Sequence, residues 1–183
     1  VPNSEVLIRN VGINPTRDGI LHVCRQMNGN ISILNRKNES GEPTADLLVR
    51  SSALQGTVIE GSIIPTLIDE LPILAAMACY AKGTTVIRDA AELKVKESNR
   101  ITVMAENLRA MGADVTETED GMIIHGGRPL HGAVIDSKKD HRIAMTFAVT
   151  ALAAEGETEI LDADCVNISY PGFYSDLARL KRE

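Results

Sequence analysis

Hydrophobic positions along the chain follow a recurring order, in which a short apolar run precedes a segment with apolar residues every three or four positions. A run of the first kind predicts a β-strand, and a segment of the second kind predicts an amphipathic helix. Such strand and helix pairs lie at 5–10 and 17–27, at 84–88 and 99–111, and at 157–162 and 172–180. Their recurrence indicates an internal repeat.

Two helices of a different kind lie between these pairs. The segments 72–81 and 142–154 are rich in Ala and Met and are apolar nearly all round, which is typical of helices inside a domain. Short strand-like runs fill the intervals, at 31–34, 46–49, 57–60, 115–118, 122–125 and 133–136. We therefore predict an α+β fold built of repeated βαβαββ units.

The first of these units is shorter than the later ones. A strand and an Ala-rich helix precede the pair in the second unit, but no counterpart stands before Val1. We expect a truncated first unit. The stretch 39–44, with Ser, Gly and Pro, is typical of a surface turn rather than of a linker. We therefore expect residues 1–183 to form one domain.

Composition narrows the classes of function. With 183 residues and 44% apolar content the chain can bury one core. A net charge of -6 argues against a general nucleic-acid binder, which needs clustered positive charge. No window approaches 18 apolar residues and no secretory signal pattern is found, so we expect no membrane contact and a cytoplasmic location.

The cysteines favour reduced thiols. Cys24, Cys79 and Cys165 are odd in number, widely spaced and set in apolar or mixed surroundings, and no pair has the CxxC spacing of a zinc site. We expect mostly buried, unpaired thiols and no bound metal.

Basic residues gather where helices are expected to begin, although the chain as a whole is acidic. Lys96 and Arg100 stand at one such start, and Lys138, Lys139 and Arg142 stand at another. A cation in the first turn opposes the helix dipole by a few tenths to about 1 kcal/mol unless an anion binds there. Since the planar guanidinium group grips carboxylate or phosphate, the two arginines predict two anionic groups. For Lys94, Lys138 and Lys139 a solvated surface patch is an equal alternative.

Acidic residues stand beside the same helix starts, and each has a structural alternative. Asp140 is placed as an N-cap, and we favour that role over chemistry. Asp69 precedes a proline suited to a first turn and could serve only the helix dipole. Glu97 could be a salt-bridged surface carboxylate. His141 could carry a proton, but a lone His at a helix start is more often a hydrogen-bonding scaffold residue.

The segment 88–100, Arg-Asp-Ala-Ala-Glu-Leu-Lys-Val-Lys-Glu-Ser-Asn-Arg, resembles the enolpyruvyl transferases, and among them the 5-enolpyruvylshikimate-3-phosphate synthases. Three more motifs agree in order and spacing: Ile-Asp-Glu-Leu-Pro at 68–72, Asp-His-Arg-Ile-Ala-Met at 140–145 and Ser-Tyr-Pro-Gly-Phe at 169–173. The resemblance runs from near Val1 to the end of the chain.

This resemblance implies a reaction. In the family, the 5-hydroxyl of shikimate 3-phosphate joins C2 of phosphoenolpyruvate, and phosphate leaves the tetrahedral intermediate to give an enolpyruvyl ether. No metal or organic cofactor takes part. The resemblance implies that Asp69 contacts the ring hydroxyls and can act as base, that Lys96 reaches the reacting hydroxyl, and that Glu97 shuttles a proton to the methylene carbon.

The resemblance also implies the groups that bind the substrates. Arg100 and Arg142 match the arginines that hold phosphoenolpyruvate, with His141 beside them, and Glu92 matches a position that lines the shikimate side. Ile168 departs from the family, because some members have a phosphoenolpyruvate-binding Lys there. This departure suggests a variant pocket.

The family fold consists of two similar domains, each of three βαβαββ units, whose helix N-termini face a shared cleft. The chain matches the C-terminal domain, which is half of this inverse α/β barrel. The N-terminal half supplies the groups that grip the 3-phosphate, and none of its motifs occurs in residues 1–183. We therefore expect that half as a partner and half a site on this chain.

Two alternatives differ in class. A UDP-N-acetylglucosamine enolpyruvyl transferase shares the fold and phosphoenolpyruvate, although the motifs at 96–100 and 140–142 favour the shikimate enzyme. The chain could also be an isolated, non-catalytic domain whose only task is to bind its partner half.

Overall fold

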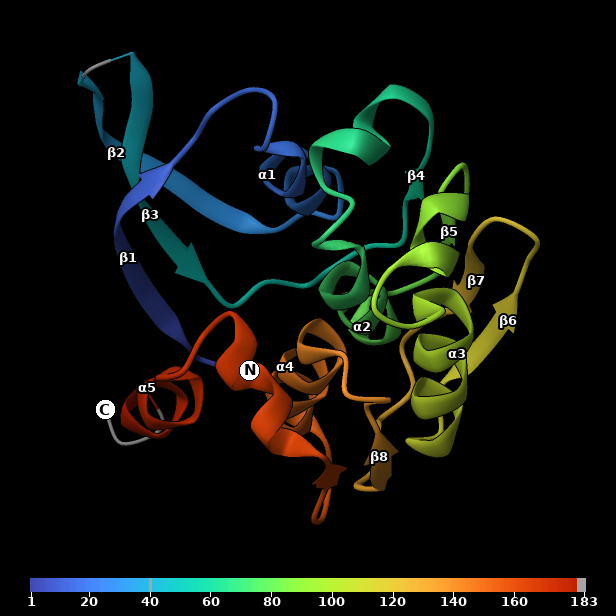
Figure 1. Ribbon diagram of the computed structural model, residues 1–183. Coiled ribbons are helices and arrows are strands. Elements are labelled where there is room, and N and C mark those ends of the chain that lie inside the picture. Colours follow the sequence, from blue (N-terminus) through green and yellow to red (C-terminus); the bar gives the residue numbers. More distant parts are fainter. Residues whose placement is uncertain (40, 181–183) are drawn as a thin grey trace.

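The computed structural model describes residues 1–39 and 41–180, which form an α+β fold, as predicted. The helices are α1 (Gly19–Gln26), α2 (Leu71–Tyr80), α3 (Arg100–Ala110), α4 (His141–Thr150) and α5 (Phe173–Leu180). The strands are β1 (Glu5–Gly12), β2 (Asn30–Glu39), β3 (Glu42–Arg50), β4 (Val58–Ile59), β5 (Thr84–Ile87), β6 (Asp114–Glu117), β7 (Met122–His125), β8 (Val134–Asp136) and β9 (Glu159–Leu161). Figure 1 shows α2 and α4 in the middle of the molecule, with strands on either side.

The strands pair in a similar order at different places in the chain. β1, β3 and β2 form one antiparallel sheet in the order β1–β3–β2. β5, β7 and β6 pair in the same way, and β4 adds to β5 in parallel. β8 and β9 pair in parallel, as β4 and β5 do. Each helix from α2 to α4 begins shortly after a strand or a 3₁₀ turn that follows one.

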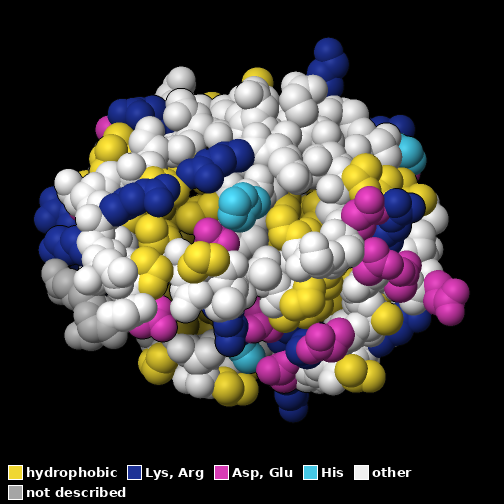
Figure 2. All heavy atoms as spheres, turned by 90° about the horizontal axis from the view of Figure 1, so that it is seen from above, with side chains coloured by type: hydrophobic (Ala, Val, Ile, Leu, Met, Phe, Trp, Pro, Cys, Tyr) yellow, Lys and Arg dark blue, Asp and Glu magenta, His cyan; other side chains and the backbone are white. Residues whose placement is uncertain are grey.

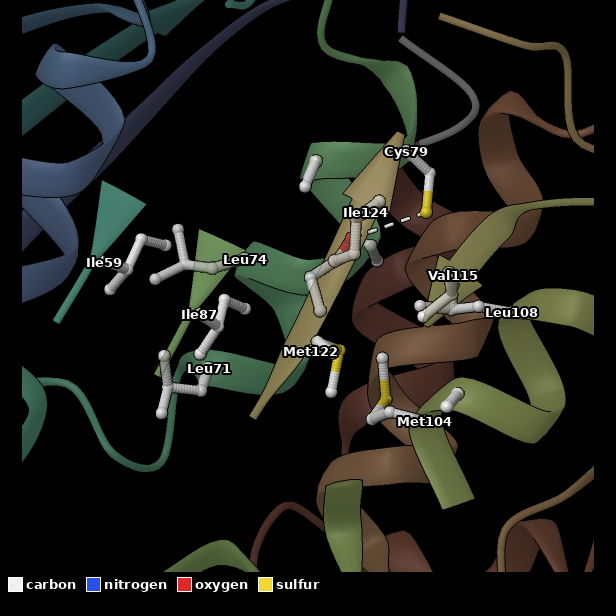
Figure 3. Close-up of a cluster of buried hydrophobic side chains, with 14 of the residues drawn as sticks. Ile59, Leu71, Leu74, Cys79, Ile87, Met104, Leu108, Val115, Met122 and Ile124 are labelled. Carbon is white, nitrogen blue, oxygen red and sulfur yellow. Dashed lines mark hydrogen bonds between the residues drawn. The ribbon is translucent and has the colours of Figure 1, made fainter. Parts of the chain in front are cut away.

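The two Ala-rich helices lie inside the domain, as their sequence predicts. Most residues of α2 and α4 are buried, and the two helices pack against each other. Figure 3 shows Leu71 and Leu74 of α2 grouped with Ile59 of β4 and Ile87 of β5. Burying one such aliphatic side chain contributes about 1.5–3 kcal/mol. This core holds fixed the starts of α2, α3 and α4.

The thiols are unpaired, as predicted. Cys24 and Cys79 are buried and Cys165 is partly buried. Burial raises the pKa of Cys79 to about 12, so this thiol stays protonated at neutral pH. The core therefore holds no reactive thiolate at this position.

Two predicted segments differ from the structure. The stretch 39–44, predicted as a surface turn, belongs largely to a long hairpin, because β2 runs to Glu39 and β3 begins at Glu42. Residue 40 lies outside the described residues. The outer part of the hairpin is exposed and polar, so its strands carry no apolar alternation. The helix predicted at 142–154 ends at Thr150 and continues as a 3₁₀ turn at Ala151–Ala153.

Four 3₁₀ helices connect the main elements among the described residues, and the apolar pattern predicts none of them: η1 (Gly61–Thr66), η2 (Ala91–Val95), η3 (Ala151–Ala153) and η4 (Ala163–Ile168). Short 3₁₀ turns lack the repeat of apolar positions that marks a longer helix. η1 leads toward α2 and η2 toward α3, so both help to place the segments described next.

No helix among the described residues has the length and apolarity that a membrane span requires.

Candidate active site

The residues predicted for the site lie at the N-terminal ends of three helices that contact one another, α2, α3 and α4. Asp69 lies just before α2. The segment 92–100 covers η2 and the start of α3, and His141 and Arg142 open α4. Caps fix two of these starts. Asn99 accepts a hydrogen bond from Thr102 N at 3.3 Å, and Asp140 accepts from Arg142 N at 3.0 Å.

Arg100 is the centre of the site, and it is buried. Its side chain is only 1% exposed and contacts three carboxylates from three segments. Nε lies 2.9 Å from Asp140 Oδ2, Nη1 lies 3.4 Å from Asp69 Oδ1, and Nη2 lies 2.6 Å from Glu97 Oε2. The buried cation is therefore compensated, as its burial requires.

Asp69 links the two arginines. One carboxylate oxygen faces Arg100, and the other lies 3.2 Å from Arg142 Nη2. The N-cap position of α2 is Glu70, and no side chain caps this helix. The main contacts of Asp69 are therefore with two guanidinium groups. A role in the helix dipole alone does not explain them.

Glu97 and Arg142 are the more accessible members of the cluster. The side chain of Glu97 is 51% exposed and that of Arg142 is 34% exposed. Glu97 does form an ion pair, as the structural alternative holds, but its partner is the buried Arg100 rather than a surface lysine. At these exposures both side chains are accessible to a ligand in the site.

Lys96 and Glu92 form a separate pair four residues apart, joined by a hydrogen bond from Nζ to Oε1. Lys96 directly follows η2, and its side chain is less exposed than that of Glu92. Both residues belong to the same short segment as Glu97, so the segment 92–97 brings two lysines and two carboxylates toward the start of α3.

His141 is almost fully buried, with 6% exposure. Its Nδ1 atom has no hydrogen-bond partner among the described residues. A scaffold histidine is expected to be satisfied by hydrogen bonds, so the scaffold interpretation leaves this nitrogen unexplained. The unpaired atom fits a residue that completes its hydrogen bonds with a ligand.

The predicted anion sites are already occupied by protein carboxylates. Arg100 and Arg142 face Asp69, Glu97 and Asp140, so the cluster holds more acidic than basic groups. Figure 2 shows that one face of the molecule carries both charges, with a group of Lys and Arg on the left and further Lys and Arg beside the Asp and Glu on the right and along the lower edge. An anion that binds Arg100 must therefore compete with a carboxylate of the protein.

The two lysines before α4 lie in a turn with positive φ, 51° at Lys138 and 60° at Lys139. Lys138 pairs with Asp136, and its side chain is about half exposed. The contacts of Lys138 fit the surface alternative.

Several features were missed at the level of the sequence. Ser98 donates to Asp140 Oδ2 at 3.0 Å, and Asp140 contacts Arg100 as well as capping α4. Burial, followed by the charge of Asp69, raises the pKa of Glu70 above its ordinary value. Sequence patterns give no signal for contacts between residues 40 or more positions apart.

A shallow, open pocket lies elsewhere. Its volume is about 300 Å³, and it is lined by Ala133, Val134, Glu157, Thr158 and Glu159, at the start of β8 and β9. α4 begins beyond the opposite end of β8. With two carboxylates and no cation, this pocket does not suit an anionic ligand, so we place the candidate site at the helix starts. Over 1–39 and 41–180 no group of three His, Cys, Asp or Glu side chains could hold a metal ion.

Comparisons with known proteins agree with one another. A family model described as EPSP synthase (3-phosphoshikimate 1-carboxyvinyltransferase) matches residues 1–177. The 3-phosphoshikimate 1-carboxyvinyltransferases of Synechococcus sp. (strain JA-3-3Ab) and Desulforamulus reducens are each 56% identical, over 98% and 94% of this chain. The chain spans about 40% of the length of these curated relatives.

Solved structures give the same picture. An EPSP synthase structure from Acinetobacter baumannii matches 97% of this chain with a TM-score of 0.93 and 40% identity, and the match covers 42% of that chain. The enolpyruvyl transferase NikO from Streptomyces tendae matches 97% of this chain and 39% of its own, with a TM-score of 0.77. At 19% identity the second match concerns the fold alone.

Proposed function

The chain belongs to the EPSP synthase (3-phosphoshikimate 1-carboxyvinyltransferase) family, and on that premise we propose that the complete protein transfers the enolpyruvyl group of phosphoenolpyruvate to the 5-hydroxyl of shikimate 3-phosphate. Phosphate is the second product. Residues 1–183 supply one half of the site, as the C-terminal domain of a longer protein. The observation that carries this proposal is the cluster of two arginines and three carboxylates where α2, α3 and α4 begin.

The reaction needs cations, a base and an acid, and the cluster offers each. Arg100 and Arg142 hold the carboxylate and phosphate of phosphoenolpyruvate, and His141 donates or accepts through its unpaired Nδ1. Asp69 removes the proton of the 5-hydroxyl as that oxygen bonds to C2, while Lys96 contacts the same oxygen. Glu97 delivers a proton to the methylene carbon and takes one back from the resulting methyl group as phosphate leaves, and the departing phosphate accepts the proton that Asp69 removed from the hydroxyl.

The starting ion pairs suggest how binding prepares these groups. Arg100 contacts Asp69 and Glu97 in the free chain, at 3.4 Å and 2.6 Å. When a substrate anion takes their place on the guanidinium group, both carboxylates lose a cationic partner. Substrate binding would thus free both carboxylates from Arg100 and leave them able to face the reacting groups.

Glu92 lies on the shikimate side in this proposal. Its partner is Lys96, which lies closer in sequence to the start of α3 than Lys94 does. By pairing with Lys96 in the free chain, Glu92 holds the ammonium group in place until the hydroxyl of the substrate arrives.

We propose in addition that residues 1–183 form one domain of repeated βαβαββ units with a truncated first unit. The elements β4, α2, β5, α3, β6 and β7 follow each other in that order. The order β1–β3–β2 repeats β5–β7–β6, and the parallel pair β8–β9 repeats β4–β5. These correspondences support a repeat, in which α2 and α4 occupy equivalent places.

In this proposal the chain carries only half of the site. The N-terminal half of the longer protein would supply the groups that grip the 3-phosphate. Without it, the substrate anions stay exposed to water and lose much of their electrostatic stabilisation. We expect the chain alone to turn over undetectably or very slowly, with the N-terminal half as its functional partner.

The choice of acceptor tests the proposal. The complete protein is expected to release phosphate from phosphoenolpyruvate when shikimate 3-phosphate is present, and not when UDP-N-acetylglucosamine replaces it. Phosphate release is measured for both acceptors under the same conditions. Turnover with the nucleotide sugar alone would move the assignment to the other enolpyruvyl transferase, and turnover with neither acceptor would refute both assignments.

A further inference from the structure

Asp140 makes more contacts than a helix cap requires. Its Oδ1 atom accepts from the backbone nitrogens of Arg142 and Ile143, at 3.0 Å and 3.4 Å, which is the capping role. Its Oδ2 atom accepts instead from Arg100 Nε at 2.9 Å and from Ser98 Oγ at 3.0 Å. The two oxygens therefore serve different elements, α4 on one side and the start of α3 on the other.

The pair formed by Asp140 and Arg100 is buried on both sides, at 0% and 1% exposure. Burial raises the pKa of Asp140, but the hydrogen bond and charge of Arg100 and the hydrogen bond of Ser98 outweigh it, so the pKa lies below its ordinary value. The carboxylate is ionised at neutral pH. A second contact, from Arg100 Nη2 to Oδ1 at 3.3 Å, makes the pairing two-pointed.

A two-point contact along one edge fixes the plane of a guanidinium group. With Nε and one hydrogen of Nη2 used on Asp140, the rest of the donors point the other way. These donors meet Asp69 and Glu97, which are 25% and 51% exposed, so this end of the group faces the accessible side of the site. Arg100 is thus held from behind and presents its far end.

We propose that Asp140 is a positioning residue, which orients the guanidinium group of Arg100 toward the phosphoenolpyruvate anion, with Ser98 holding its second oxygen. The inference rests on the proposed function, because it names the ligand that Arg100 receives. Asp140 does not touch the substrate. Its own negative charge opposes anion binding, so its benefit to the site comes from orientation alone.

The substitution Asp140→Asn in the complete protein separates the two roles. Asn is as good an N-cap as Asp, and its remaining oxygen can keep the bonds to the nitrogens of Arg142 and Ile143. The NH₂ group that replaces Oδ2 cannot accept from Arg100 Nε. We expect KM for phosphoenolpyruvate to rise about tenfold or more, as is usual for losing a charge-assisted contact, with a smaller change in kcat.

Two control variants accompany Asp140→Asn. One makes the same change from carboxylate to amide at another position, and the other removes a neighbouring contact of Asp140. Asp136 lies four residues before Asp140, and its exposed carboxylate accepts a hydrogen bond from the backbone nitrogen of Lys138. Asp136→Asn should leave both kinetic constants unchanged. Ser98→Ala removes one bond to Asp140, so its KM should lie between those of the wild type and Asp140→Asn.

A double-substitution cycle separates positioning from a merely structural effect. If Asp140 acts through Arg100, then Asp140→Asn should raise KM by less than about twofold in a protein that already carries Arg100→Lys, because the ammonium group has no edge to align. A general loss of structure would instead multiply the two effects. If Asp140→Asn folds poorly, Ser98→Ala still tests the inference, because it removes one bond to Asp140 and leaves the buried charge pair in place.

The outcomes are distinct. A wild-type protein that releases no phosphate refutes the proposed function and with it this inference. An active wild type combined with an unchanged or lowered KM in Asp140→Asn overturns the inference alone, because it would mean that the carboxylate only repels the substrate. The same increase in KM with and without the Arg100→Lys substitution also overturns it.

Discussion

Replacement of Glu97 by Gln in the complete protein should lower kcat by about 10²–10⁴-fold, the usual contribution of a positioned acid or base. Gln has the same shape as Glu and can still accept a hydrogen bond from Arg100 Nη2, which lies 2.6 Å from Glu97 Oε2. It cannot carry a proton at neutral pH. The side chain is about half exposed, so the substitution should not disturb the core.

The expected loss therefore lies in kcat, with KM for phosphoenolpyruvate nearly unchanged, and steady-state kinetics measures both. Arg142→Ala provides the contrast. It removes a cation that holds the anion, so KM should rise about tenfold or more while kcat changes less. The reverse pattern, with turnover lost in the Arg142 variant and affinity lost in the Glu97 variant, would overturn the roles assigned to both residues.

Replacement of Arg100 by Met should destabilise the fold by about 3–5 kcal/mol, the usual result of removing one partner from a buried ion pair. Asp140 would remain fully buried without its cation, and Asp69 would lose one of its two arginines. Urea denaturation of the chain, followed by circular dichroism, measures the free energy of unfolding.

Arg50→Met is the matched control for this loss. Arg50 pairs with Glu5 at 2.6 Å, but both side chains are exposed, at 42% and 59%. An exposed pair of this kind contributes about 0–1 kcal/mol. If the two variants lost similar amounts of stability, the buried network around Arg100 would not stabilise the domain in the way described.

Helices with a strong apolar pattern could be predicted from the sequence almost to the residue. α2 was expected at 72–81 and lies at Leu71–Tyr80, because a nearly all-apolar segment has no stable place except the interior. α3 was expected at 99–111 and lies at Arg100–Ala110, where Asn99 caps its start and Gly112 follows its end. Pattern and capping signals agree there.

The outer hairpin could not be predicted, because its stability comes from local pairing rather than burial. Asp46 on β3 accepts a hydrogen bond from the nitrogen of Asn10 on β1 and another from the side chain of Asn35 on β2, both at 2.8 Å. Asn10 and Asn35 have φ angles of 53° and 49° at the bulges of their strands. These polar residues, taken singly, are typical of turns.

The residues of the site were found through family motifs and through cations at helix starts, but their connections were not. Asp140 was interpreted as a cap, and the cap is confirmed by its bonds to the nitrogens of Arg142 and Ile143. Its bond to Arg100 spans 40 positions of sequence. No periodicity reports such a contact, since it depends on how α3 and α4 pack.

The sequence predicts open anion sites at the helix starts, and the structure differs from this prediction. A cation in the first turn of a helix is unfavourable unless an anion is near, and from the sequence we expect that anion to be a ligand. Arg100 in fact contacts the protein's own carboxylates, Asp69, Glu97 and Asp140. Under the proposed function, the ligand therefore replaces Asp69 and Glu97 on Arg100, which ties substrate binding to the release of these two carboxylates.

Phosphate release from phosphoenolpyruvate and shikimate 3-phosphate should be measured for this chain alone and after mixing with a separately made N-terminal half. We expect undetectable or very slow release by either half and a clear rate after mixing, because the proposed site is completed across the cleft. No increase in rate on mixing two folded halves would contradict this proposal.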